Sequence, residues 1–185
     1  QRIISERRKN TTFQSIPSGS LFRIPFSVEN EETALTRHFP RRPFVPADER
    51  QRAQRCEEIL TIQAMGLKKR LDHTHAKTAV VGISGGLDST LALLVTARAF
   101  DMLGRDKKDI IAVTMPCFGT TDRTYNNACE MTKKTGATLK EVPIAEAVNI
   151  HFRDIGQDPE NHDVTYENSQ ARERTQVLMD IANRT

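Results

Sequence analysis

An apolar run at residues 78–83, Thr-Ala-Val-Val-Gly-Ile, most constrains the fold of this chain, because it leads straight into a glycine pair and then a helical pattern. Such a short and partly β-branched run is typical of a strand that is covered on both faces. Similar runs follow at 110–113 and 138–142. Because helical patterns separate these runs, the sequence predicts an α/β fold, with a Rossmann-like parallel sheet, flanking helices and right-handed crossovers.

Helical periodicity predicts which segments cover this sheet. Asp48 and Gln51 resemble a capping box, and apolar residues recur at three- and four-residue intervals from Ala53 to Leu71, so a helix is expected from about residue 48. Gly136 is expected to end another helix in the left-handed conformation. The remaining helices are expected at 89–103, 122–135, 144–155 and 167–183. In the last of them, the residues expected to face inward are Ala171, Leu178 and Ile181.

The composition excludes several classes of protein. A chain of 185 residues with 37% apolar and 28% charged residues suits one soluble globular core of ordinary size. The formal charge of +3, from 27 basic and 24 acidic residues, does not indicate a nucleic-acid partner. The sequence has no apolar run of membrane length and no signal-peptide pattern. Scattered cysteines without metal-ligand spacing predict reduced thiols and a cytoplasmic location; they are Cys56, Cys117 and Cys129.

The first 47 residues differ from the rest of the chain in having many prolines and no sustained periodicity. Prolines recur from Pro17 to Pro46, and short apolar groups lie between them. Such a pattern is typical of extended segments rather than of helices or central strands. The sequence therefore predicts a linker over 1–47 that lies on another surface, followed by a folded domain over 48–185.

The predicted strand and the helix after it are joined by Ser-Gly-Gly-Leu-Asp-Ser at residues 84–89. Glycines let backbone N–H groups approach a ligand closely, and a helix N-terminus adds unpaired donors and the positive end of a dipole. These features predict a phosphate site, to which Ser84 and Ser89 add hydroxyl groups. Asp88 would repel phosphates unless a cation lay between them, so this carboxylate indicates Mg²⁺. The alternative interpretation is a glycine turn in which Asp88 and Ser89 only cap the helix.

The complete string resembles the pyrophosphate loop of the N-type ATP pyrophosphatases, whose fold is of the adenine nucleotide alpha hydrolase type. It has neither the Gly-Lys-Ser/Thr ending of a Walker A motif nor the spaced glycines of a dinucleotide-binding loop. Members of that superfamily cleave ATP between the α and β phosphates and adenylate a substrate oxygen. The resemblance implies an ATP site formed by the whole loop, with Asp88 binding Mg²⁺. The loop residues are Ser84, Gly85, Gly86, Leu87, Asp88 and Ser89.

A second string narrows the substrate. Residues 166–174, Tyr-Glu-Asn-Ser-Gln-Ala-Arg-Glu-Arg, resemble a helix of the NAD synthetases. In that family the positions that match Asn168 and Arg172 contact deamido-NAD, and the guanidinium group of Arg172 suits a phosphate or a carboxylate. The string at 115–124 resembles a segment near the ATP site in the long, glutamine-dependent branch of the family. No histidine is placed to activate Cys117, so no catalytic role is predicted for this cysteine.

The resemblance covers about residues 40–185 and implies a ligase of NAD biosynthesis. In such an enzyme the carboxylate of deamido-NAD attacks the α-phosphorus of ATP, pyrophosphate leaves, and ammonia from glutamine displaces AMP to give NAD. Residues 1–40 resemble the tail of a nitrilase-like glutaminase domain with its linker, and 48–185 resemble part of the synthetase domain. The implied partners are small-molecule substrates, this glutaminase domain and further copies of the chain, with neither nucleic acid nor membrane.

The family pattern continues with a Gly-Thr-rich segment, a second metal-binding glutamate and a closing loop. The chain ends at Thr185, before these features. By itself it is therefore expected to bind ATP weakly and to make no NAD. Two other interpretations remain open: a different adenylating enzyme, such as a tRNA-modifying one whose usual paired cysteines are absent here, and a non-catalytic nucleotide-binding module.

Overall fold

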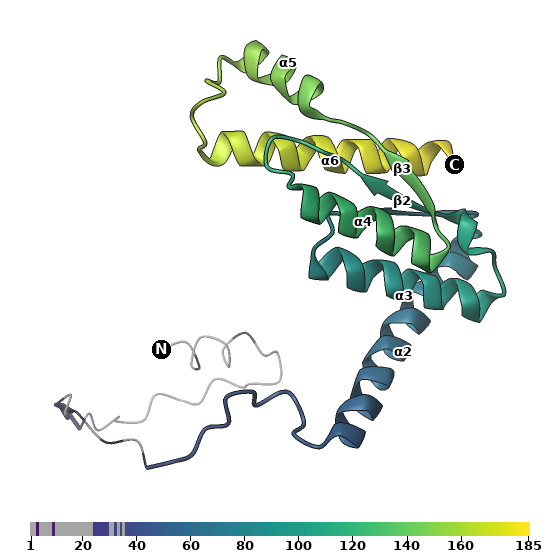
Figure 1. Cartoon of the computed structure of the whole chain (residues 1–185). Coiled ribbons are helices and arrows are strands. Elements are labelled where there is room, and N and C mark those ends of the chain that lie inside the picture. Colours follow the sequence, from purple (N-terminus) through teal and green to yellow (C-terminus); the bar gives the residue numbers. More distant parts are fainter. Residues whose placement is uncertain (1–2, 4–8, 10–23, 30–31, 33, 35) are drawn as a thin grey trace. The chain divides into compact units, whose positions relative to one another are not determined.

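The computed structural model in Figure 1 describes residues 3, 9, 24–29, 32, 34 and 36–185. The chain divides into two units, Gln1–Pro43 and Phe44–Thr185. The predicted linker over 1–47 lies largely outside the described residues, and its assignment to a glutaminase tail stays a prediction. Among the described residues, no helix is long and apolar enough to cross a membrane.

The second unit is built on a parallel sheet with the strand order β1-β2-β3. Its strands are β1 (Ala79–Gly82), β2 (Ile110–Thr114) and β3 (Thr138–Glu141). The register pairs Ala79 with Ile110 and Ile111 with Thr138. Helices cross between the strands, α3 (Leu87–Leu103) after β1 and α4 (Asp122–Thr135) after β2. The predicted α/β fold with a parallel sheet and flanking helices is confirmed.

Local capping interactions set the ends of two of the remaining helices. After β3 come α5 (Ala145–Ile155) and α6 (Val164–Arg184), and a short 3₁₀ turn, η1 (Lys107–Asp109), precedes β2. The helix α4 ends at Gly136, which has a φ of 83°, so the predicted left-handed cap is confirmed. The helix α6 begins three residues before the predicted start, because the carboxylate of Asp163 accepts hydrogen bonds from the backbone N–H groups of Thr165 and Tyr166.

The sheet lies between α3 and α4 on one side and α5 and α6 on the other (Figure 1), and each side holds an apolar core. Phe100 of α3 packs in one core with Ile110 and Ala112 of β2, and the alternate residue Val113 packs in the other core with Phe152 of α5. All five of these side chains are buried. Alternating strand residues therefore enter opposite cores, which is why the strand reads as a continuous apolar run.

The interior face of α6 differs in part from the prediction. Leu178 and Ile181 pack against the second core, as predicted. The prediction for Ala171 was wrong, because this residue is exposed. The buried residues of α6 are the polar Ser169 and Gln170. In the first half of the helix Tyr166 packs against the second core. One aromatic residue marks the inward face less clearly than the repeated apolar residues of the second half do.

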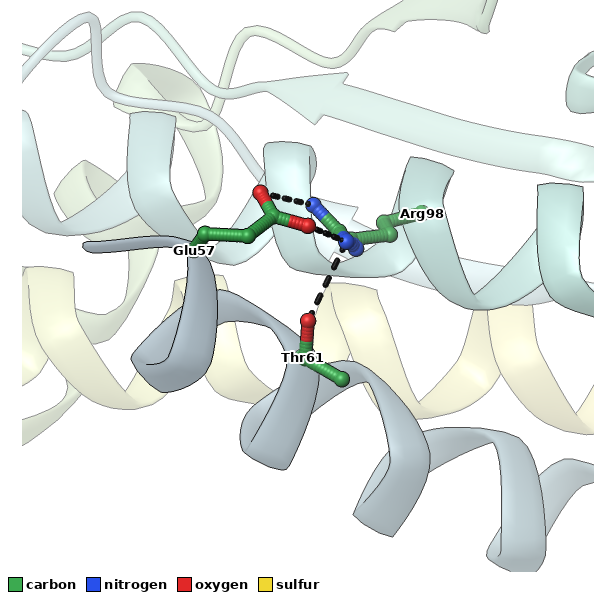
Figure 2. Close-up of polar contacts among 3 residues, drawn as sticks. All are labelled: Glu57, Thr61 and Arg98. Atoms are coloured by element: carbon green, nitrogen blue, oxygen red, sulfur yellow. Dashed lines mark hydrogen bonds and ion pairs between the residues drawn. The ribbon is translucent and has the colours of Figure 1, made fainter. Parts of the chain in front are cut away.

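The helix α2 (Glu49–Thr74) begins at the predicted cap, where the Asp48 carboxylate accepts a hydrogen bond from the N–H of Gln51 at 2.8 Å. It packs along α3, and a polar cluster joins the two helices (Figure 2). The guanidinium group of Arg98 forms an ion pair with both carboxylate oxygens of Glu57 and donates a hydrogen bond to the Thr61 hydroxyl at 3.1 Å. The hydrogen bond from Arg98 also lowers the pKa of Glu57. This fork–fork pair adds a polar link between α2 and α3.

Candidate functional site

The predicted phosphate loop lies at the carboxyl end of β1. The N–H of Ile83 still pairs with the carbonyl oxygen of Val113 at 2.8 Å, after which the chain leaves the sheet. Gly85 turns the chain with a φ of 77°, and Gly86 is the N-cap of α3. In parallel α/β sheets, ligands bind at this end of the strands, so the loop occupies the expected place.

Gly85 is required by its surroundings as well as by its backbone angle. A Cβ atom at this position would collide with the carbonyl oxygen of Thr124, in the first turn of α4. The loop therefore packs against the backbone of α4 at a distance that only glycine permits. At Gly86, by contrast, φ is −89° and an added Cβ would meet only the Ser84 hydroxyl, at 3.3 Å.

The start of α3 is left open as an anion site. Gly86 has no side chain, and no side-chain hydrogen bond caps this helix within the described part of the chain. The first N–H groups of the helix therefore have no intrahelical partner and no side-chain acceptor. They are available to a negatively charged ligand, which the positive end of the helix dipole also favours.

Two hydroxyl groups are held beside this helix end by a small hydrogen-bond network. The Ser84 and Ser89 oxygens lie 3.1 Å apart, and Ser89 Oγ accepts from the Ser84 N–H at 3.3 Å. The Ser89 and Thr90 hydroxyls both donate to the carbonyl oxygen of Gly86, at 3.1 and 2.7 Å. The loop is thus organised before any ligand arrives, so little ordering is needed on binding.

A cavity of about 560 Å³ opens beside the loop. Ser84 and Gly86 line it on one side, and Thr120 and Thr124 line it from the segment at 115–124. This volume falls within the range of roughly 300–1,000 Å³ that is usual for small-ligand sites. The structure therefore brings together the loop and the 115–124 string, which were identified separately in the sequence.

Tyr125, which lines the cavity, is hydrogen-bonded to the strand β3 at the edge of the sheet. The Tyr125 hydroxyl donates a hydrogen bond to the carboxylate of Glu141 at 2.6 Å, at the end of β3. This hydrogen bond and the neighbouring Cys129 thiol raise the pKa of Tyr125 to about 12. Tyr125 therefore stays protonated at neutral pH and holds the start of α4 against β3.

The helix α6 meets the cavity through residues that include two for which the sequence predicted no site role. Gln170 and Arg174 line it together with Leu178. The spacing of four residues places all three on one face of the helix. Leu178 was predicted to face inward, so counting back from it in steps of four would have identified Arg174 and Gln170.

The predicted deamido-NAD residues lie on another face of α6. Asn168 and Arg172 are exposed and line a separate hollow of about 600 Å³, formed by α6 side chains such as Met179 and Asn183. The structure does not bring Asn168 or Arg172 to the Ser84 loop, and their assignment stays a prediction.

Asp88 lies in the exposed first turn of α3. Among the described residues, no group of three or more His, Cys, Asp or Glu side chains could hold a metal ion. A single carboxylate still suits Mg²⁺, because this ion keeps several waters and is usually bound by one or two carboxylates together with substrate phosphates. A metal at Asp88 would thus depend on the phosphates of a bound nucleotide. Leu87 beside it is 84% exposed and offers only its backbone to the site.

The chain is similar to known NAD synthetases. A family model described as NAD synthase matches residues 59–185. The glutamine-dependent NAD(+) synthetase of Mycobacterium leprae is 42% identical over 167 residues, which cover 87% of this chain and 25% of that protein. The chain thus spans about a quarter of the length of the curated relatives it matches.

Solved structures of this group share the fold. A glutamine-dependent NAD+ synthetase from Acinetobacter baumannii, in complex with adenosine diphosphate, has a TM-score of 0.63 and 27% identity, covering 69% of this chain and 24% of that one. An NH3-dependent NAD synthetase from Campylobacter jejuni has a TM-score of 0.58 at 21% identity, covering 69% of this chain and 52% of that one, which shows likeness of fold.

Proposed function

Because the chain belongs to the NAD synthase family, we propose that it forms the nucleotide-binding part of a glutamine-dependent NAD(+) synthetase. Such a ligase converts deamido-NAD to NAD, using ATP and ammonia released from glutamine. The observation that carries the proposal is the loop at 84–89, which combines an open helix N-terminus, two fixed hydroxyls and an adjoining cavity of nucleotide size.

The proposed reaction has two steps. The carboxylate of deamido-NAD attacks the α-phosphorus of ATP, the bond to the β-phosphate oxygen breaks, and pyrophosphate leaves. Ammonia then attacks the adenylated carbonyl carbon, loses a proton, and AMP leaves with the electron pair. The protein supplies positioning and electrostatic stabilisation rather than a covalent bond.

Each part of the loop has its own proposed role in binding ATP. Backbone N–H groups at the start of α3, together with the hydroxyls of Ser84 and Ser89, bind the phosphates of ATP and stabilise the departing pyrophosphate. Gly85 and Gly86 allow the loop to approach the phosphates. Asp88 would hold Mg²⁺ against the nucleotide, where the ion would neutralise phosphate charge.

We further propose that deamido-NAD contacts Asn168 and Arg172 on the outer face of α6. This face does not line the loop cavity, so a substrate that touches both sites would extend past the edge of α6 or lie between two copies of the chain. From the family resemblance, we propose that the protein is a homo-oligomer in the cytoplasm and receives ammonia from a nitrilase-like glutaminase domain.

The test uses the intact protein with ATP, Mg²⁺, deamido-NAD and ammonia or glutamine. The expected result is formation of NAD, AMP and pyrophosphate in equal amounts, and no pyrophosphate when deamido-NAD is omitted. Pyrophosphate release that depends on tRNA instead would favour a tRNA-modifying enzyme. ATP binding without any turnover would favour a non-catalytic nucleotide-binding module.

A further inference from the structure

We infer that Arg174 of α6, which lines the same cavity as Ser84 and Gly86, binds the pyrophosphate portion of ATP. The inference rests on the proposed function for the identity of the nucleotide. It concerns a residue other than the predicted Arg172, although the two arginines lie in the same turn of α6. The geometry of α6, the charge of the cavity and the contrast between the two arginines support it.

Two contacts with β1 show the direction of α6. Its C-cap residue, Thr185, lies beside the start of β1, where the hydroxyls of Thr78 and Thr185 are 2.9 Å apart. Leu178 lies beside the other end of β1, because a Cβ on Gly82 would be 3.0 Å from its Cδ1. The helix therefore runs antiparallel to β1. The lengths of the two segments agree. The seven steps from Leu178 to Thr185 span about 10 Å along the helix axis, and the four steps from Thr78 to Gly82 span about 13 Å along the strand.

This direction places Arg174 beyond the end of the strand. Four residues before Leu178, the helix has advanced by a further distance of about 6 Å. The chain of β1 has by then turned into the phosphate loop, so Arg174 faces the same cavity as Ser84 and Gly86. The close approach depends on Gly82, whose missing side chain leaves room for Leu178.

The charge of the cavity lining comes from Arg174. Within the described part of the chain, Arg174 is the only charged residue that lines this cavity, and no ion pair links it to an acidic side chain. The residue is half-buried. A partly desolvated guanidinium without a counter-ion favours an anionic ligand, and its planar donors suit two phosphate oxygens at once. The open helix N-terminus of α3 also favours an anionic ligand.

Arg172 differs from Arg174 in its surroundings. This residue is exposed and lines the outer hollow with Met179 and Asn183. Positions two apart on a helix point in nearly opposite directions. One arginine is therefore available to the nucleotide phosphates, and the other is available to a ligand on the outer face.

The test measures binding of inorganic pyrophosphate and of ATP to the intact protein by calorimetry, for Arg174→Ala, Arg174→Lys and the matched control Arg172→Ala. For Arg174→Ala we expect the Kd for pyrophosphate to rise by about tenfold or more. Arg174→Lys should retain part of the affinity, since the charge remains but the paired donors are lost. Arg172→Ala should keep the pyrophosphate Kd within about twofold of the wild type.

Circular dichroism spectra and Tm values would show whether each variant is folded, and Arg174→Gln replaces the alanine variant if that one is not. Unchanged pyrophosphate affinity in a folded Arg174 variant, an equal loss in Arg172→Ala, or failure of the wild type to bind pyrophosphate would each overturn the inference. The proposed function is judged separately: wild-type protein that binds pyrophosphate but makes no NAD would contradict that function alone.

Discussion

Gly85 and Gly86 are adjacent in the sequence, yet the structure uses them for different purposes. Gly85 has the left-handed backbone and touches the Thr124 carbonyl, whereas Gly86 has an ordinary backbone and leaves the start of α3 uncapped. The first glycine is therefore needed for folding of the loop. The second is needed for access of a ligand to the helix N-terminus.

The two glycines can be separated by alanine substitution. Gly85→Ala should destabilise the protein, since the left-handed conformation alone costs roughly 1–2 kcal/mol and the contact with Thr124 adds to that cost. Gly86→Ala should change stability far less and should weaken ATP binding. Thermal unfolding and ATP titration of both variants check this, and equal loss of Tm in the two would contradict it.

Asp88 is exposed, so its role in a metal site can be tested without loss of the fold. Asp88→Ala in the intact protein should reduce adenylation, measured as pyrophosphate release, by about 100-fold or more, because phosphate charge is then not neutralised. Its Tm should stay near that of the wild type. The matched control is Glu146→Ala, another exposed acidic residue in the first turn of a helix, which should leave pyrophosphate release near the wild-type level. Near-normal pyrophosphate release by Asp88→Ala at saturating Mg²⁺ would rule out the metal assignment.

At the scale of single elements, α6 combines three surfaces in one helix. Its second half packs on the sheet through Leu178, one polar face reaches the loop cavity through Arg174, and the outer face carries Asn168. The angular position of the helix decides which polar residues meet the nucleotide. That position depends on how the helix begins and on what it packs against.

The start of α6 is set by Asp163, whose pKa is lowered chiefly by the hydrogen bond from the Tyr166 N–H. A lowered folded-state pKa means that the cap stabilises the protein above the unfolded pKa and is lost as pH falls through the folded value.

Asp163→Ala should therefore lower Tm at pH 7. Its difference from the wild type should shrink below a pH of about 4. Asp163→Asn keeps a capping group without a titrating one, so its difference from the wild type should follow a different pH profile. A Tm difference between Asp163→Ala and the wild type that does not change with pH would contradict the role of the carboxylate.

At the scale of the whole molecule, the sheet is shared by two cores on opposite faces. Phe100 and Phe152 are fully buried, one in each core, and β2 sends alternate residues into both. Neither core can lose its packing without exposing a face of the same strands. We therefore expect the unit Phe44–Thr185 to unfold as one cooperative structure.

Phe100→Ala and Phe152→Ala test this cooperativity. Each should cost about 3–5 kcal/mol, and each should shift a single transition that has the same midpoint by far-UV and near-UV circular dichroism. The measurement uses the 185-residue chain. The exposed Phe44 offers a control, since Phe44→Ala should shift the midpoint little. Two separate transitions in Phe152→Ala would show that the α5–α6 side unfolds on its own.

The sequence by itself determined the order of strands and helices, because buried parallel strands and capped helices follow local rules. The run at 110–113, the cap at Asp48 and the glycine stop at Gly136 were each found where they were predicted. It also predicted the glycine turn and the start of a helix at 84–89, since both are local properties of the chain.

Only the tertiary structure decided which face of α6 meets the loop. The buried residues in the first half of this helix, Ser169 and Gln170, are polar, and Tyr166 is the partly buried aromatic residue there, so apolar periodicity marked the inner face only weakly. Ala171 was misplaced for that reason, and the place of Arg174 in the lining of the loop cavity was not predicted. The orientation was set by packing between residues that are far apart in sequence, above all the contact of Leu178 with Gly82, and no local rule contains such a contact.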